Sequence, residues 1–82
     1  MRIKWNANFQ IEDSTVKLGE AFIRVIKFEN VNSKCNVEYM ITDEAEESMA
    51  KYVRKTFDRT FINETEVYNQ LLSEYVDSVL VA

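Results

Sequence analysis

The sequence contains no histidine, no proline, one glycine and one cysteine. Without histidine, the commonest general base and metal ligand are both missing. A single glycine cannot form the phosphate-binding loops of nucleotide-binding enzymes, which need several. The lone Cys35 alternates with Val37 and Tyr39, which is typical of a small buried side chain. We therefore expect no catalytic residue, metal site, cofactor or small-molecule substrate, and the protein is not expected to be an enzyme.

Length and composition predict one globular domain that covers residues 1–82. The chain is 46% hydrophobic and 12% aromatic, which is too apolar for intrinsic disorder. No apolar run approaches the roughly 18 residues of a membrane-spanning helix. The charged start, Met1-Arg-Ile-Lys-Trp5, lacks the apolar centre of a signal peptide. We expect a cytoplasmic protein with no membrane contact.

Three segments have the apolar pattern of β-strands: 2–12, 16–29 and 35–42. The first and third alternate between apolar and polar residues. The second is apolar on both parities from Ala21 to Phe28, interrupted only by Arg24 and Lys27. This pattern is typical of a strand in the middle of a sheet. Turn-forming residues separate the three strands, and Gly19 predicts a bulge or bend before the central one.

Segment 43–59 has features of an amphipathic helix. Asp43 and Glu46 have the spacing of a capping box, and acidic residues crowd the first turn. An apolar stripe follows at helical spacing: Ala45, Met49, Tyr52, Val53 and Phe57. We expect a first helix here.

Segment 64–78 predicts a second helix. Asn63 and Glu66 repeat the capping-box spacing, and Ile62 with Val67 could form a hydrophobic staple. The apolar tail 79–82 is compatible with helix or strand. Three strands followed by two helices predict an α+β fold, in which a three-stranded antiparallel meander packs both helices on one face (β-β-β-α-α).

Charge is distributed unevenly along the chain. Residues 60–82 contain no basic residue and four acidic ones: Glu64, Glu66, Glu74 and Asp77. The formal net charge is −4, so direct binding of nucleic acid is disfavoured. The acidic residues either keep a solvated helix face soluble or dock on a basic surface of another protein.

Three apolar residues predict a protein-binding surface: Phe22, Phe28 and Met40. If two helices cover only one face of the sheet, some of these side chains are left at the surface, where exposed apolar area usually marks a partner site. The alternative is that Phe22 and Phe28, with Ile26, close a core under the connection between the helices. We expect the edge of the first or third strand to pair with a neighbour.

Two resemblances point to bacteriophage proteins. The segment Val16-Lys-Leu-x-x-Ala-Phe-Ile-Arg-Val25, followed by Asn36-Val-Glu-Tyr39, resembles a hairpin module of small virion and tail-associated phage proteins. The acidic chain with Glu66-Val-Tyr-Asn69 near its end is similar to acidic phage anti-CRISPR inhibitors that mimic DNA. The first resemblance implies a virion location.

The resulting hypothesis is a non-enzymatic protein–protein interaction module, a small structural or accessory subunit of a larger assembly, which binds a protein partner or itself. The alternative is an acidic inhibitor that occupies a nucleic-acid-binding surface.

Overall fold

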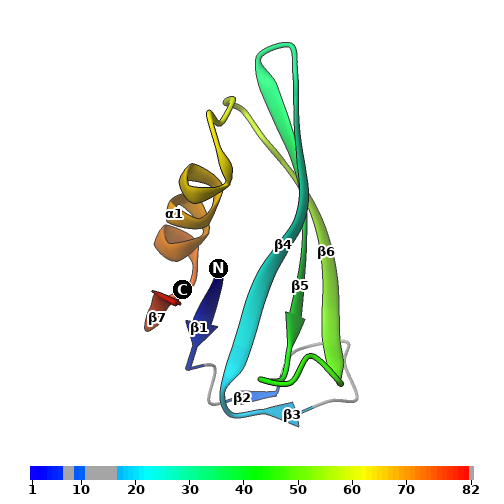
Figure 1. Cartoon of the computed structure of the whole chain (residues 1–82), viewed down its shortest axis with the longest axis vertical. Helices are drawn as coiled ribbons and strands as arrows, with labels where there is room; N and C mark the ends of the chain where they lie inside the picture. The colour runs from blue at the N-terminus through cyan, green and yellow to red at the C-terminus, as the bar shows by residue number, and fades with distance from the viewer. Residues whose placement is uncertain (7–8, 11–16, 82) are drawn as a thin grey trace.

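The computed structural model describes residues 1–6, 9–10 and 17–81. The elements of this part of the chain are β1 (Arg2–Trp5), β2 (Phe9–Gln10), β3 (Lys17–Leu18), β4 (Ala21–Val31), β5 (Lys34–Thr42), β6 (Met49–Phe57), α1 (Glu64–Glu74) and β7 (Ser78–Val81). Five strands form one antiparallel sheet in the order β6-β5-β4-β1-β7 (Figure 1), and β2 pairs with β3. As predicted, β4 is the central strand of the larger sheet.

The predicted β-β-β-α-α fold is wrong, because segment 43–59 forms no helix and the fold is mostly sheet. Residues 49–57 are strand β6, which pairs antiparallel with β5. The helical stripe was misleading because Val53 and Phe57, four residues apart, also share one face of a strand. Aromatic and β-branched residues also favour a strand here, and pairing with β5 supplies the partner that a strand needs.

The turn before β6 uses the residue that was predicted to cap a helix. The Asp43 carboxylate accepts the backbone N–H groups of Glu47 and Ser48 at 2.8 and 3.2 Å. The Asp43 N–H donates to the Ser48 carbonyl at 3.1 Å, and Glu46 adopts a left-handed conformation with φ 58°. An aspartate side chain satisfies backbone donors equally well in a turn and at a helix start. Here it reverses the chain so that β6 returns along β5.

Of the three predicted strands, 35–42 is confirmed, whereas 2–12 and 16–29 are each divided between two strands of different sheets. Segment 2–12 contains β1 and, separately, β2; residues 7–8 and 11–12 lie outside the described residues. Segment 16–29 is divided by a bend at Gly19 into β3 and β4. Segment 35–42 is strand β5 with one residue added. The turn-forming residues between the second and third segments make a two-residue loop, in which Asn32 has φ 58°.

The second predicted helix is confirmed but ends earlier, at Glu74 rather than at residue 78. The Asn63 side chain caps it by accepting the Glu66 N–H at 3.0 Å. The hydrophobic staple does not form, because Ile62 is 87% exposed whereas Val67 is fully buried. Asp77 adopts φ 61° and turns the chain into β7, which pairs with β1, so the apolar tail is a strand.

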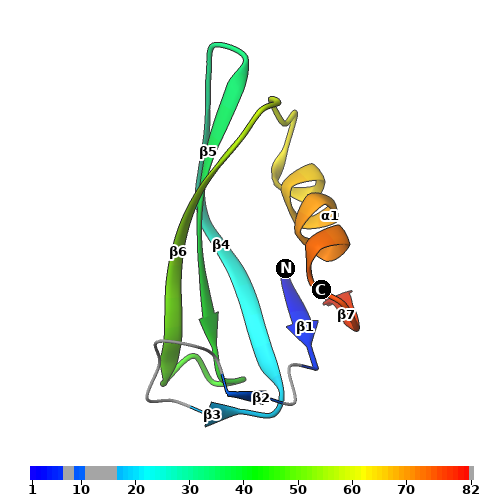
Figure 2. The same cartoon turned by 180° about the vertical axis from the view of Figure 1, so that it is seen from behind.

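The core lies between α1 and one face of the sheet. Figures 1 and 2 show α1 alongside β1 and β4, with the β4–β5 turn projecting beyond the start of the helix. The largest fully buried side chains come from both layers: Ile3, Ile23, Val37, Tyr39, Phe61, Val67, Tyr68 and Leu71. The helix therefore covers the β1–β4–β5 part of this face, and β6 contributes little besides Phe57 and the half-buried Ala50 and Val53.

Two polar side chains join the helical layer to β4. The Tyr68 hydroxyl accepts the Val25 N–H at 2.9 Å and donates to the Met1 carbonyl at 3.0 Å. The Asn30 side chain donates to the Phe61 carbonyl at 2.7 Å and accepts the Phe61 N–H at 3.0 Å. Each contact satisfies backbone groups that no neighbouring strand pairs, and so helps to hold α1 on the sheet.

Candidate functional site

The candidate site is the edge strand β6, which pairs with β5 on one side only. Within the described residues, no strand pairs with its outer side, and Figure 2 shows β6 along one margin of the sheet. β6 has nine residues, of which six are exposed, two are half-buried and Phe57 alone is buried. An unpaired edge of this length presents a row of backbone donors and acceptors, which is what an added strand requires. We call this row and its side chains the β6 edge.

Three apolar side chains form an anchor beside the β6 edge: Met40, Met49 and Tyr52. Tyr52 lies opposite Met40 in the β5–β6 register, and Met49 lies opposite Thr42. Met40 and Tyr52 occupy the sheet face that points away from α1, because residues of the other parity, such as Tyr39 and Val53, pack in the core. Met49 joins them on this face although it has the parity of Val53, because a register shift between Ile41 and Thr42 changes the alternation of β6. Met49 is 55% exposed and Tyr52 45% exposed, while Met40 is half-buried.

The charges of the β6 edge are all basic: Lys51, Arg54 and Lys55. Arg54 faces the Glu38 carboxylate at 3.7 Å, and its own side chain is 77% exposed. Lys55 forms an ion pair with Glu74 of α1. Lys51 takes part in no ion pair within 1–6 and 19–81, where side chains are described. Lys51 and Arg54 therefore direct positive charge into solvent from opposite faces of the strand.

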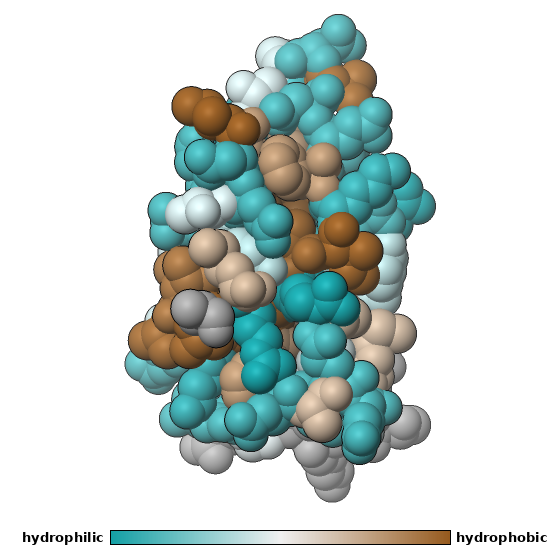
Figure 3. Space-filling model, in the orientation of Figure 1, coloured by the Kyte–Doolittle hydropathy of each residue, from teal (hydrophilic) through white to brown (hydrophobic). Residues whose placement is uncertain are grey.

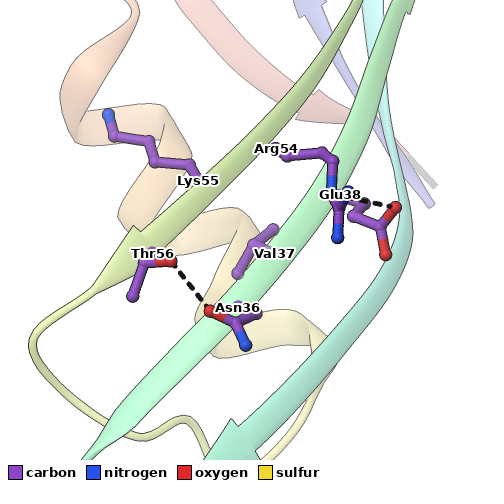
Figure 4. Close-up of a pocket in the computed structure, with 6 residues that line it drawn as sticks. All are labelled: Asn36, Val37, Glu38, Arg54, Lys55 and Thr56. Atoms are coloured by element: carbon purple, nitrogen blue, oxygen red, sulfur yellow. Dashed lines mark hydrogen bonds and ion pairs between the residues drawn. The ribbon is translucent and has the colours of Figure 1, made fainter.

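A shallow hollow of about 250 Å³ lies over β5 and β6. Figure 4 shows the residues that line it: Asn36, Val37, Glu38, Arg54, Lys55 and Thr56. Two cross-strand contacts order its polar groups, the Arg54–Glu38 pair and a 2.8 Å hydrogen bond from the Thr56 hydroxyl to Asn36. Tyr52 also donates to Glu38, and this hydrogen bond raises the pKa of the Tyr52 hydroxyl.

The structure does not bring Phe22, Phe28 and Met40 together as an exposed patch. Phe22 is only 5% exposed, and the Arg2 guanidinium lies over its ring at 4.3 Å. Phe28 lies on the other face, because a bulge between Val25 and Lys27 shifts the alternation of β4. It is half-buried against the core. Of the three predicted residues, only Met40 lies at the candidate site.

The predicted acidic residues lie on α1 and just after it, and two of them are used internally. Glu66 pairs with Arg59 at 3.1 Å, and Glu74 pairs with Lys55. Glu64 and Asp77 are exposed. The acidic surface available to a partner is therefore smaller than the sequence predicts.

The strands predicted to form the edges are interior. β1 lies between β4 and β7, and β5 lies between β4 and β6. The second edge is β7, which has four residues, and Figure 3 shows hydrophobic surface in the area of this strand. Val79 of β7 and Val76 before it are 56% and 79% exposed.

Sequence reasoning missed the role of Met49, Lys51, Tyr52 and Arg54, because it placed them on a helix. The available signal was the content of β-branched and aromatic residues in this segment, Tyr52, Val53, Thr56 and Phe57, which favour a strand.

Comparison with protein-family models, curated proteins and solved structures finds no match for the chain. Among the described residues, the helix α1 has 11 residues and is too short to cross a membrane. Among the described side chains, no three acidic or cysteine residues lie close enough together to hold a metal ion.

Proposed function

We propose that the protein is a non-enzymatic interaction module, a small structural or accessory subunit that joins a larger assembly by accepting a strand at the β6 edge. The observation that carries this proposal is the nine-residue edge strand, whose outer side is unpaired within the described residues. Extended over its full length, such a strand spans about 30 Å. Backbone hydrogen bonds along this row supply affinity, and side chains on both faces supply selectivity.

The apolar anchor supports strand addition at β6. An added strand would place its own side chains beside Tyr52 and Met49, extending the exposed apolar area around Met40. Aromatic residues and methionine are enriched where proteins bind one another. β7 is the weaker candidate edge, because its four residues offer fewer backbone groups.

The acidic inhibitor remains the alternative proposal, with less support. Its predicted contact surface is the set Glu64, Glu66, Glu74 and Asp77. The ion pairs of Glu66 and Glu74 with Arg59 and Lys55 already neutralise half of these charges. A phage origin, with the virion or the host cytoplasm as location, likewise stays part of the proposal.

Site-specific photo-crosslinking in the producing cell tests the main proposal. A photoreactive phenylalanine analogue replaces Tyr52 on β6, and in the matched control it replaces Ile62, which is 87% exposed and lies outside the sheet. We expect a discrete adduct from position 52 only. In the purified crosslinked complex, the backbone amides of Met49–Phe57 should exchange hydrogen more slowly than in the free protein. Equal adducts at both positions, or no protection of β6, would refute strand addition.

A further inference from the structure

The charge of the β6 edge carries an inference about the partner, and it rests on the strand addition proposed above. β6 contains three basic residues and no acidic one, in a chain of formal net charge −4. We propose that the partner is an extended acidic segment of another protein, which pairs antiparallel with β6.

A second copy of this chain fits the same edge less well than a partner of opposite charge. If two β6 strands paired antiparallel about Val53, the register that uses the middle of the edge, Lys51 of each would lie opposite Lys55 of the other. Like charges that face each other across neighbouring strands destabilise the pair. In this register the basic residues oppose self-pairing and favour a partner of opposite charge.

The placement of the charges also favours a peptide over nucleic acid. Lys51 and Lys55 share the face of Val53, which packs against the core, whereas Arg54 shares the opposite face with Tyr52. A nucleic acid that follows a basic track needs its contacts on one surface. An added strand projects side chains to both faces, so its carboxylates can meet all three basic residues.

The register specifies the partner's pattern. In an antiparallel partner strand, the residues opposite Lys55 and Arg54 should be acidic. The next two residues should be apolar, and the fifth, opposite Lys51, should be acidic. The two apolar residues would lie opposite Val53 and Tyr52. Lys55 pairs with Glu74 and Arg54 pairs with Glu38, but the Arg54 side chain is 77% exposed against 42% for Lys55, so Arg54 is the more available of these two. Lys51 forms no ion pair within the described side chains.

Fluorescence polarisation with synthetic nine-residue peptides tests the inference. The acidic peptide has the pattern above at its centre, and the neutral peptide has glutamine in place of each acidic residue. We expect the acidic peptide to bind at least about tenfold more tightly, as three cross-strand charge pairs should give. We also expect this preference to shrink with added salt.

Two protein variants locate the charge effect. Lys51→Gln with Arg54→Gln should remove the preference for the acidic peptide. The matched control, Lys27→Gln with Lys34→Gln, makes the same change in net charge on β4 and β5 and should retain it. Circular dichroism of both variants checks that the fold is unchanged. Equal loss in the two variants would show a general charge effect and would overturn the inference.

Two N-methylated acidic peptides separate this inference from the proposed function. In an extended peptide, alternate N–H groups point to opposite edges, and only one edge would face β6. N-methylation of the residues whose N–H groups face β6 should therefore abolish binding, and N-methylation of the other residues should preserve it. A neutral peptide that binds as tightly, with the same effect of N-methylation, would refute the acidic partner and leave strand addition standing. Equal binding of both N-methylated peptides would refute strand addition itself. Absence of binding up to about 1 mM, or equal displacement by a single-stranded oligonucleotide, would overturn the acidic partner.

Discussion

The Tyr68 hydroxyl is expected to contribute more to stability than a typical tyrosine hydroxyl, and Tyr68→Phe tests this. The β1–β4 register pairs Ile3 with Ile23, so two residues further along it would place Met1 opposite Val25. In its place, the hydroxyl accepts the Val25 N–H at 2.9 Å and donates to the Met1 carbonyl at 3.0 Å. The tyrosine thus bridges the two strands where their ladder ends.

The magnitude follows from what the substitution leaves behind. Tyr68 and the hydrogen bond that it accepts are buried, so phenylalanine would leave the Val25 donor without a partner. An unsatisfied buried donor costs about 1–3 kcal/mol, and the second, part-buried hydrogen bond adds about 0.5–1 kcal/mol. We expect a loss of about 2–3 kcal/mol. A domain of 82 residues has a total stability of roughly 4–12 kcal/mol, so the effect would be large.

Urea denaturation of the wild type and two variants provides the measurement. Tyr68→Phe should lower the midpoint with an unchanged m-value, and the melting temperature should fall by roughly 10–20 °C. Tyr52→Phe is the matched control, because it removes the same atom and an exposed hydrogen bond, to Glu38, from a side chain that is 45% exposed. The Val25 amide should also exchange faster in the Tyr68 variant. A Tyr68→Phe protein that stays within about 0.5 kcal/mol of the control would refute the reasoning.

Three further predictions concern the β4–β5 pair and its contacts. Asn30→Ala removes both hydrogen bonds to the Phe61 backbone and should destabilise the fold by about 1–3 kcal/mol in urea denaturation; an unchanged midpoint would contradict this. Burial raises the pKa of Tyr39, so this group ionises first in the unfolded chain, and its contribution to stability should hold below pH of about 10 and fall above it by at most about 1.4 kcal/mol per pH unit; Tyr39→Phe should remove this part of the fall and leave the part due to Tyr68, whose pKa burial also raises. Cys35 is fully buried, so a thiol reagent should label it only after unfolding, and rapid labelling of the native protein would count against the packing described.

The local patterns of the sequence determined several elements correctly. The central position of β4 in the sheet was predicted from its apolar residues on both parities, because a strand that is apolar on both faces needs other residues packed on each face. The start of α1 followed from Asn63, whose side chain satisfies an N–H group of the first turn wherever the helix packs. The burial of Cys35 followed from its alternation with Val37 and Tyr39.

Tertiary structure alone decided the identity of segment 43–59 and hence the candidate site. The residues Asp43 and Met49–Phe57 are compatible with a capped helix or with a turn and a strand, since both use an aspartate to bind backbone N–H groups and both can align Val53 with Phe57. The unpaired side of β5 resolved the choice, because β6 satisfies its backbone groups over nine residues. The same long-range pairing made β1 and β5 interior strands and β6 an edge strand. The local sequence pattern of a strand does not indicate which other strands lie beside it.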